Sequence, residues 1–185
     1  MKQKELNHRL HSNFFQRDTL EVAPELIGKT LVRKLEDNSI RKFKITEVEA
    51  YCGTEDLACH ASKGRTPRTE VMFKEGGLVY VYLIYGMYWM LNIVTGREND
   101  ASAILIRGID NISGPGRVGK ALQLNKTFYG ENISTSNRIW IEDSDVVTKF
   151  STSPRIGINY AGEPWISKPW RFITCLLYTS PSPRD

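Results

Sequence analysis

A carboxylate, a histidine and a run of tyrosines lie close together in one stretch of the sequence. The stretch begins with TEVEAYCGTEDLACH, which contains Glu49, Tyr51 and His60. It continues through VYVYLIYGMYW, which carries four tyrosines, and closes on ILIRG with Arg107. One carboxylate among aromatic rings and cations suits a site that grips a flat nucleobase and hydrolyses the bond that holds it.

Taken one at a time, these residues also have ordinary structural explanations. Glu49 alone is compatible with a surface carboxylate at a strand end, which is what we expect of Glu47. His60 alone is more often structural than functional, and tyrosines are common in strands. Alternation along the strand places Tyr80 and Tyr82 on one face and three aliphatic residues on the other. The surrounding motifs, and not the single residues, therefore carry the functional prediction.

The elements that must position these residues are mostly strands. Apolar runs predict strands around Leu31, in IRKFKITEVEAY, in ASAILIRGID and in RIWIEDS. GLVYVYLIY and MYWMLNIVT predict a long hairpin with its tip near Gly86. Short helices are expected after Asp18 and in SGPGRVGKALQLNK, and loops are expected beyond Pro154. We predict an α+β fold: a single domain with a largely antiparallel, curved β-sheet, a protruding β-hairpin and flanking helices.

Composition sets wide bounds on function. A chain of 185 residues with 41% hydrophobic and 25% charged residues is typical of one globular domain. The net charge of +4 is compatible with a polyanionic partner without being diagnostic of one. No apolar run is long enough to predict a membrane span, and the N-terminus lacks the apolar core of a signal peptide. We expect a cytoplasmic protein.

The cysteines and the C-terminal residues lead to two further expectations. Cys52, Cys59 and Cys175 make an odd number, which favours reduced thiols, and their spacing matches no common zinc motif. We therefore expect no metal. The last residues, TCLLYTSPSPRD, change character abruptly and contain SPSP, which extends neither a strand nor a helix. We predict a functional domain at 1–173 and a disordered or non-native tail at 174–185.

Six motifs resemble, in the same order, those of the alkylpurine (3-methyladenine) DNA glycosylase family. They are EVEAYCGTEDLACHASKGRTPR, VYVYLIYGMYWMLNIVT, ILIRG, SGPGRVGKAL, PRIGINYAGEPW and KPWRF, and the resemblance covers almost all of residues 14–173. It implies a monofunctional base-excision-repair enzyme that flips damaged purines, alkylated or deaminated, out of double-stranded DNA and hydrolyses the N-glycosidic bond. It further implies a monomer that needs no metal or organic cofactor.

The resemblance assigns the catalytic roles. The first Glu of the EAY motif is Glu49, which would activate a water molecule and stabilise the positive charge that develops on the sugar. Arg107 and the backbone carbonyl of Ile156 would help to hold that water. Outside the family context, an arginine on an apolar strand is most often an edge or ion-pairing residue.

The same resemblance assigns the base pocket. Tyr51, His60 and Tyr82 would stack on the flipped base, and a cationic alkylpurine would gain additional attraction from ring faces. Asn92 would disfavour the exocyclic amine of guanine.

A DNA-binding surface is expected around the hairpin. Tyr85 at the tip would enter the gap left by the flipped nucleotide, with Met87 close by. Among the cations, Arg68, Arg117 and Lys126 are predicted to meet phosphates. GPGRVGK is no nucleotide-binding P-loop, because an alanine follows its lysine where that motif needs serine or threonine.

Two other classes of function compete with a glycosylase. A non-catalytic nucleic-acid-binding module would keep the tyrosine hairpin and the cations but lose the acid, and Glu49 is present. A hydrolase of free nucleosides would need neither an aromatic residue at an exposed tip nor a rim that binds phosphates.

Overall fold

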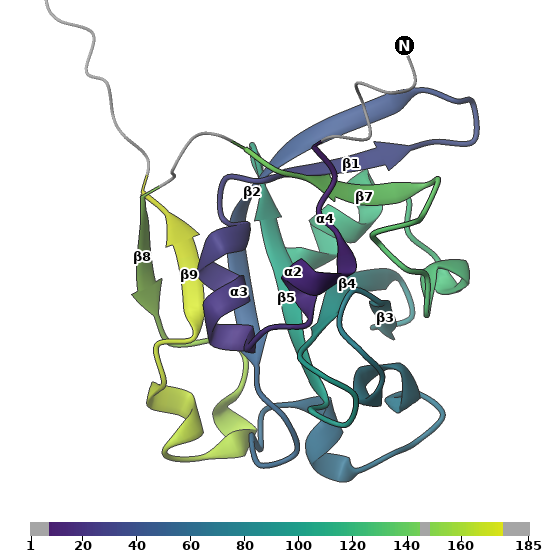
Figure 1. Ribbon diagram of the computed structural model, residues 1–185. Coiled ribbons are helices and arrows are strands. Elements are labelled where there is room, and N and C mark those ends of the chain that lie inside the picture. The colour runs from purple at the N-terminus through teal and green to yellow at the C-terminus, as the bar shows by residue number, and fades with distance from the viewer. Residues whose placement is uncertain (1–7, 145–148, 176–185) are drawn as a thin grey trace, which may run out of the picture.

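The computed structural model describes residues 8–144 and 149–175 (Figure 1). Nine antiparallel strands form its sheet, and the main path runs β3-β4-β5-β2-β1-β7. β6 pairs with β5, and β9 lies between β2 and β8. The strands are β1 (Thr30–Lys34), β2 (Ile40–Tyr51), β3 (Val79–Ile84), β4 (Tyr88–Thr95), β5 (Ser102–Ile109), β6 (Ile112–Ser113), β7 (Ile139–Glu142), β8 (Phe150–Ser153) and β9 (Arg171–Thr174).

Strand β2 holds the sheet together because three other strands pair with it. Its first half pairs with β1, where Leu31 lies opposite Phe43. Its second half pairs with β5 on one edge and with β9 on the other, and Glu49 has a partner on both sides. The register of β2 against β5 shifts on either side of Glu47. Such irregularities re-aim side chains, and this one lies two residues before the predicted catalytic acid.

The two faces of the sheet carry different kinds of side chains at β2. Val48 and Ala50 of β2 are fully buried in the main hydrophobic core, which also contains residues of α3 (Thr19–Leu26). Because side chains alternate along a strand, Glu49 and Tyr51 point to the opposite face. One face thus supplies the core, and the other is free to carry a site.

The helices of the described ranges are short, and the longest of them, α3, is capped by the side chain that precedes it. Asp18 caps α3, where its carboxylate accepts a hydrogen bond from the backbone N–H of Leu20 at 2.8 Å. A single turn, α2 (Ser12–Phe15), precedes it. Five 3-10 turns complete the helical elements of the described ranges: His60–Lys63, Glu70–Phe73, Lys126–Phe128, Asn159–Ala161 and Trp165–Ser167.

The glycines of SGPGRVGKAL serve packing. Helix α4 (Pro115–Ala121) lies so close to β4 that a Cβ on Gly119 would stand 1.8 Å from the carbonyl oxygen of Trp89. A Cβ on Gly116 would stand 3.0 Å from the ring of Tyr88. The motif therefore brings α4 onto the strand that returns from the hairpin.

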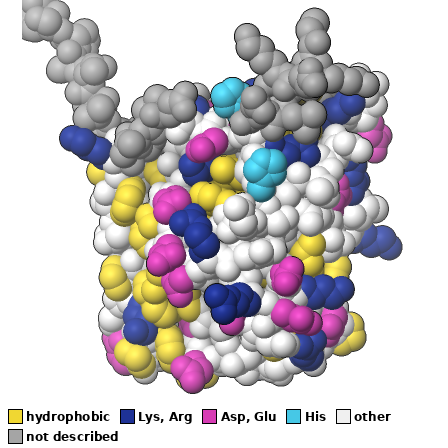
Figure 2. Space-filling view, in the orientation of Figure 1, with side chains coloured by type: hydrophobic (Ala, Val, Ile, Leu, Met, Phe, Trp, Pro, Cys, Tyr) yellow, Lys and Arg dark blue, Asp and Glu magenta, His cyan; other side chains and the backbone are white. Residues whose placement is uncertain are grey.

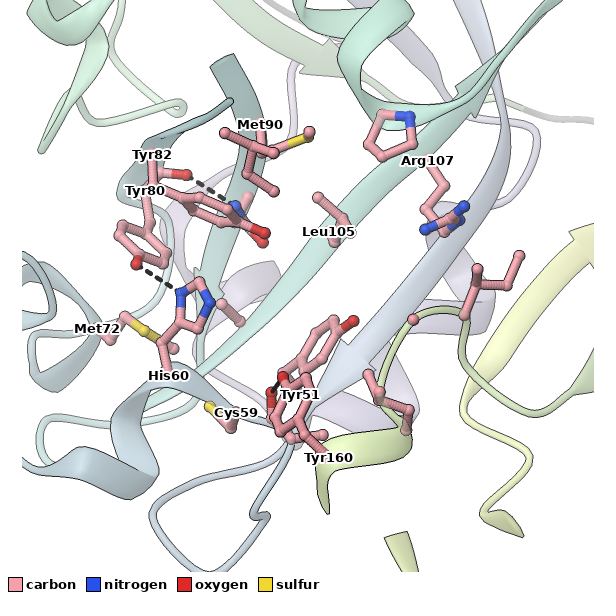
Figure 3. A pocket seen from close by; sticks show the side chains of 18 of the residues that line it. Tyr51, Cys59, His60, Met72, Tyr80, Tyr82, Met90, Leu105, Arg107 and Tyr160 are labelled. Carbon is pink, nitrogen blue, oxygen red and sulfur yellow. Dashed lines mark hydrogen bonds between the residues drawn. The ribbon is translucent and has the colours of Figure 1, made fainter. Parts of the chain in front are cut away.

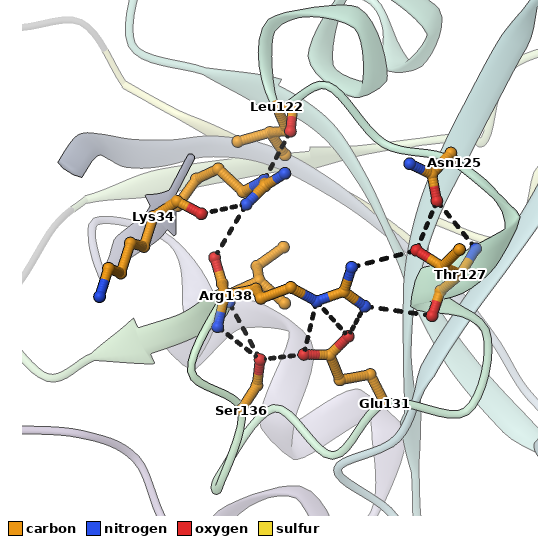
Figure 4. Close-up of polar contacts among 9 residues, drawn as sticks. Lys34, Leu122, Asn125, Thr127, Glu131, Ser136 and Arg138 are labelled. Carbon is orange, nitrogen blue, oxygen red and sulfur yellow. Dashed lines mark hydrogen bonds and ion pairs between the residues drawn. The ribbon is translucent and has the colours of Figure 1, made fainter. Parts of the chain in front are cut away.

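A polar cluster fixes the connection between α4 and β7 (Figure 4). The guanidinium of Arg138 pairs with Glu131 and donates to Thr127, and buried Arg33 donates to the carbonyl oxygen of Leu122 at 2.7 Å. Both guanidinium groups lie over the ring of Phe128, at 4.8 Å for Arg33 and 4.0 Å for Arg138. This cluster holds the 3-10 turn Lys126–Phe128 beside β3.

The predicted fold class is confirmed, including the hairpin with its tip at Gly86 and the strand beginning IRKFKIT. Three strands were not predicted: β6, β8, and β9, which uses part of KPWRF. Strand β9 includes Thr174, the first residue of the predicted tail, and residues 176–185 lie outside the described ranges. Over the face that carries α2 and α3, acidic and basic side chains are interspersed (Figure 2).

Candidate active site

The carboxylate of Glu49 is fully buried and is held by two short hydrogen bonds. The hydroxyl of Tyr51 donates to its Oε2 at 2.7 Å, and the backbone N–H of Ile156 donates to its Oε1 at 2.7 Å. The Nε of Arg107 lies 3.6 Å from Oε1. Since a carboxylate offers about four acceptor positions, Glu49 keeps capacity to accept a proton or a hydrogen bond from water.

The structure adds a contact of Ile156 that the sequence did not predict. The resemblance gave its carbonyl a role, whereas the observed hydrogen bond uses its N–H as the donor to Glu49. Arg107 and Ile156 approach Glu49 from β5 and from the segment before the Asn159–Ala161 turn, so three distant parts of the chain meet here.

The prediction that Glu47 lies at the surface was wrong. We expected a surface carboxylate, but its side chain is only 12% exposed and pairs with two arginines. Its Oε1 lies 3.3 Å from Nε of Arg107 and 3.0 Å from Nη1 of Arg171. The expectation failed because the unpredicted strand β9, which supplies Arg171, pairs with β2 at Glu47.

A cavity of about 380 Å³ opens beside the Glu49 site, and the three residues that surround the carboxylate, Tyr51, Arg107 and Ile156, line it. Figure 3 shows His60, Tyr80 and Tyr82 on one side, Tyr51 and Tyr160 on another, and Arg107 apart from both groups. The volume and the flat walls are suitable for one purine base. The predicted residues Tyr51, His60, Tyr82, Asn92, Arg107 and Ile156 all line this cavity, as does the tip residue Tyr85.

The histidine side of the cavity is an interlocked aromatic group. Nδ1 of His60 lies 2.8 Å from the hydroxyl of Tyr80, and the His60 and Tyr82 rings meet edge to face with centroids 4.6 Å apart. The guanidinium of Arg68 lies 4.9 Å from the Tyr82 ring centroid. Burial, reinforced by the charge of Arg68, lowers the pKa of His60 to about 4, so the imidazole is neutral at pH 7.

The phenols are protonated for the same physical reason. Burial raises the pKa of Tyr80 to about 12 and raises that of Tyr82 above its usual range. Burial, with the nearby charge of Glu49, also raises the pKa of Tyr51 well above its usual range. Tyr51 is therefore fixed as a donor toward Glu49.

Asn92 is buried in the wall of the cavity. Its side-chain nitrogen donates to the carbonyl oxygen of Tyr80 at 3.1 Å, across the β3–β4 pair. A buried amide fixed in this way presents a rigid polar edge to a bound base.

The hairpin tip is exposed and conformationally strained. Tyr85 is 89% exposed, with a φ of 53°, and Met87 is 65% exposed. A left-handed conformation is uncommon for a tyrosine and costs of order 1–3 kcal/mol, so strain of this kind is typical of functional positions. The loop of residues 85–87 holds a large ring in solvent at the edge of the cavity.

The predicted phosphate-binding cations lie on elements around the hairpin. Arg117 is on α4, which packs on β4, and Lys126 is in the 3-10 turn that packs on β3. Both side chains are exposed, as is that of Arg68, whose guanidinium lies over the ring of Tyr82 in β3. The structure thus groups the three cations with the hairpin.

Asp56 and Arg155 form a fully buried ion pair that the sequence analysis missed. Their two contacts measure 2.6 and 3.0 Å, and Nη1 of Arg155 also donates to the carbonyl oxygen of Ala50 at 3.0 Å. The Arg155 guanidinium lies 4.8 Å from the Tyr51 ring centroid. This pair anchors the residue before Ile156 next to Glu49. The only signal in the sequence was Asp56 itself, one of two acids in GTEDLACH.

Other chemistry finds little support in the described residues. No three His, Cys, Asp or Glu side chains lie close enough together there to hold a metal ion. Burial raises the pKa of both Cys52 and Cys59 to about 12, so neither is a reactive thiolate at pH 7. None of the helices in the described ranges has the length and apolar character of a membrane span.

Comparison with known proteins identifies the family. The sequence profile of the family described as methylpurine-DNA glycosylase (MPG) matches residues 13–113 and 109–175. A protein of Methanocella arvoryzae is 42% identical over 88% of this chain and 90% of its own length. One from Legionella pneumophila (strain Corby) is 44% identical over 89% and 93%. Both are named provisionally as 3-methyladenine DNA glycosylases. The chain belongs to this family of DNA glycosylases, which are hydrolases of N-glycosyl bonds.

The lowered pKa of His60 makes a prediction about pH. The ring should titrate near pH 4, against 6.5 for an ordinary histidine, so it stays neutral through the physiological range. Because the unfolded chain takes up this proton first, the free energy of unfolding should fall as pH drops from about 6.5 toward 4. NMR titration, with the His60→Gln variant to assign the signal, measures the midpoint. A midpoint at 6.5 or above would contradict the packing described for His60.

Proposed function

We propose that this protein is a monofunctional DNA glycosylase, which flips alkylated or deaminated purines out of double-stranded DNA and hydrolyses their N-glycosidic bond. The observation that carries the proposal is the buried Glu49 carboxylate, whose three contact residues line an aromatic cavity of purine size. Family membership supports the same reaction class. In this proposal residues 1–173 form the functional domain and act as a monomer without a metal or organic cofactor.

Glu49 would act as the general base. A water molecule between Glu49, Arg107 and the backbone of Ile156 would lose a proton to the carboxylate as its oxygen attacks C1′ of the sugar. The bond from C1′ to the base breaks in the same process, and the base leaves with the bonding electron pair. The positive charge that develops on the sugar is stabilised by the nearby carboxylate. The hydrogen bonds from Tyr51 and Ile156 support this role, because they hold the carboxylate in place.

The aromatic walls would select the damaged base. A purine that carries a positive charge gains from ring faces such as those of Tyr51 and Tyr82. A neutral His60 supports the same preference, since an imidazolium would repel a cationic base. The fixed polar edge of Asn92 would meet the exocyclic amine of normal guanine unfavourably.

The hairpin would hold DNA open. The exposed, strained Tyr85 would fill the gap left by the flipped nucleotide, with Met87 against the neighbouring bases. Arg68, Arg117 and Lys126 around it would contact phosphates. This arrangement favours DNA over free nucleosides, which would make no use of an exposed ring.

One prediction concerns the role of Glu49 as the general base. Glu49→Gln keeps the shape of the side chain but cannot accept a proton, so single-turnover excision should fall by about 10²- to 10⁴-fold. Binding to the same lesion duplex should change little. Excision within threefold of the unaltered protein would exclude Glu49 as the general base.

The second prediction concerns selectivity. Asn92→Ser removes the polar edge that meets the guanine amine, so undamaged guanine should be excised faster relative to a damaged base. The measurement is the ratio of the two single-turnover rates in duplexes of otherwise identical sequence. An unchanged ratio would remove Asn92 from the selectivity mechanism.

The third prediction concerns flipping. Tyr85→Ala should reduce the flipped fraction of an ethenoadenine, read from its fluorescence, and the defect should shrink when the lesion lies in single-stranded DNA. Arg117→Ala is the matched contrast, because the loss of a phosphate contact should weaken binding to every sequence and reduce the salt slope by about one. If both variants showed the same uniform loss of affinity, Tyr85 would be an ordinary surface contact.

A further inference from the structure

Glu47, on β2, lies within the charged cluster beneath the cavity although the proposed reaction assigns it no role. Its carboxylate oxygen Oε1 is 3.3 Å from Nε of Arg107 and 3.0 Å from Nη1 of Arg171. Arg107 in turn lies 3.6 Å from Glu49, so one guanidinium is shared between two carboxylates. The two acids and the two arginines sum to zero charge. The neighbouring Asp56–Arg155 pair is neutral by itself.

The local backbone is built to admit the Glu47 side chain. Gly108 of β5 lies opposite Glu47, and a Cβ on Gly108 would stand 3.1 Å from Cβ of Glu47 and 3.5 Å from its Oε2. It would also stand 2.9 Å from Oγ1 of Thr46. Glycine in the IRG motif therefore makes room for a carboxylate at this place.

We infer that Glu47 is a positioning residue that neutralises Arg107, so that the negative charge of Glu49 faces the cation developing on the sugar. Without Glu47, Arg107 has Glu49 as its remaining nearby carboxylate. The guanidinium would then close onto Oε1 of Glu49, cancelling its charge and occupying an acceptor position. The inference rests on the proposed glycosylase function.

Loss of the Glu47 charge should affect binding and bond cleavage differently for neutral and cationic lesions. Hypoxanthine is neutral until its bond to the sugar breaks, so a missing negative charge is felt mainly in the transition state. A 7-methylguanine nucleotide is cationic from the start, so part of the penalty falls on binding. For hypoxanthine, Glu47→Gln should therefore slow excision by about 10- to 50-fold and change the affinity for the lesion duplex by less than threefold. For 7-methylguanine, the same variant should slow excision by a smaller factor and weaken binding by a larger one. A purely structural role would affect both lesions alike.

The experiment measures single-turnover excision and binding for both lesions, with the unfolding midpoint of each variant. Glu47→Asp retains the charge and should be faster than Glu47→Gln. The double variant Glu47→Gln/Arg171→Gln also leaves Arg107 with Glu49 as its remaining carboxylate, so it should excise hypoxanthine no more than threefold faster than Glu47→Gln. Glu142→Gln is the matched control. Glu142 lies on the distant edge strand β7, its side chain is 14% exposed and it pairs with Lys42 of β2, so this variant should leave excision within twofold.

Glu47→Gln excision of hypoxanthine within threefold of the unaltered protein, or a double variant that regains the unaltered rate, would overturn the inference. If Glu47→Gln fails to fold, the single-turnover excision rate of Arg171→Gln tests the inference instead. A rate at or above that of the unaltered protein supports the charge argument, and a loss of more than fivefold overturns it. Failure of the unaltered protein to excise either base would instead count against the proposed function.

Discussion

Burying one carboxylate is the constraint on which the rest of this structure depends. An ionised side chain without solvent contact is unfavourable by several kcal/mol unless donors replace the lost water. Glu49 receives them from Tyr51 on its own strand and from Ile156, with Arg107 of β5 close by. These groups meet only if β2 lies beside β5 on one edge and the segment around residue 155 folds back on the other. The sheet order, with β5 and β9 flanking β2, satisfies this condition.

The ion pair that supports this site also buries charges, and either charge would be unfavourable without its partner. Asp56 and Arg155 are both fully buried, and removing one partner of such a pair typically destabilises a protein by about 3–5 kcal/mol. Here the pair satisfies backbone groups as well: Asp56 accepts from the N–H groups of Cys52 and Ala58, each at 3.0 Å. One ion pair thus ties the end of β2, the following loop and the residue next to Ile156 into a rigid support for the carboxylate.

Local patterns predicted most of the strands and the hairpin, because the alternation of side chains and the residues of a turn can be recognised within a short stretch of sequence. The motif EVEAY likewise located Glu49 and Tyr51, which the structure brings into contact. What the sequence could not reveal depends on pairing between distant segments. Glu47 looks exposed until β9 is placed beside β2, and Asp56 looks like a loop acid until Arg155 is placed against it. Nor did the glycines of SGPGRVGKAL reveal that Gly119 is required by close packing of α4 on β4.

The central claim is that the site holds a negative charge toward a sugar that becomes positive. The most direct test compares two uncleavable abasic duplexes, one with a neutral tetrahydrofuran ring and one with a cationic pyrrolidine ring at the same position. Transition-state mimics of this kind bind more tightly when the charge of the site is complementary. The account predicts at least about tenfold tighter binding of the cationic duplex, with the difference lost in Glu49→Gln. Equal affinity for the two duplexes would contradict it.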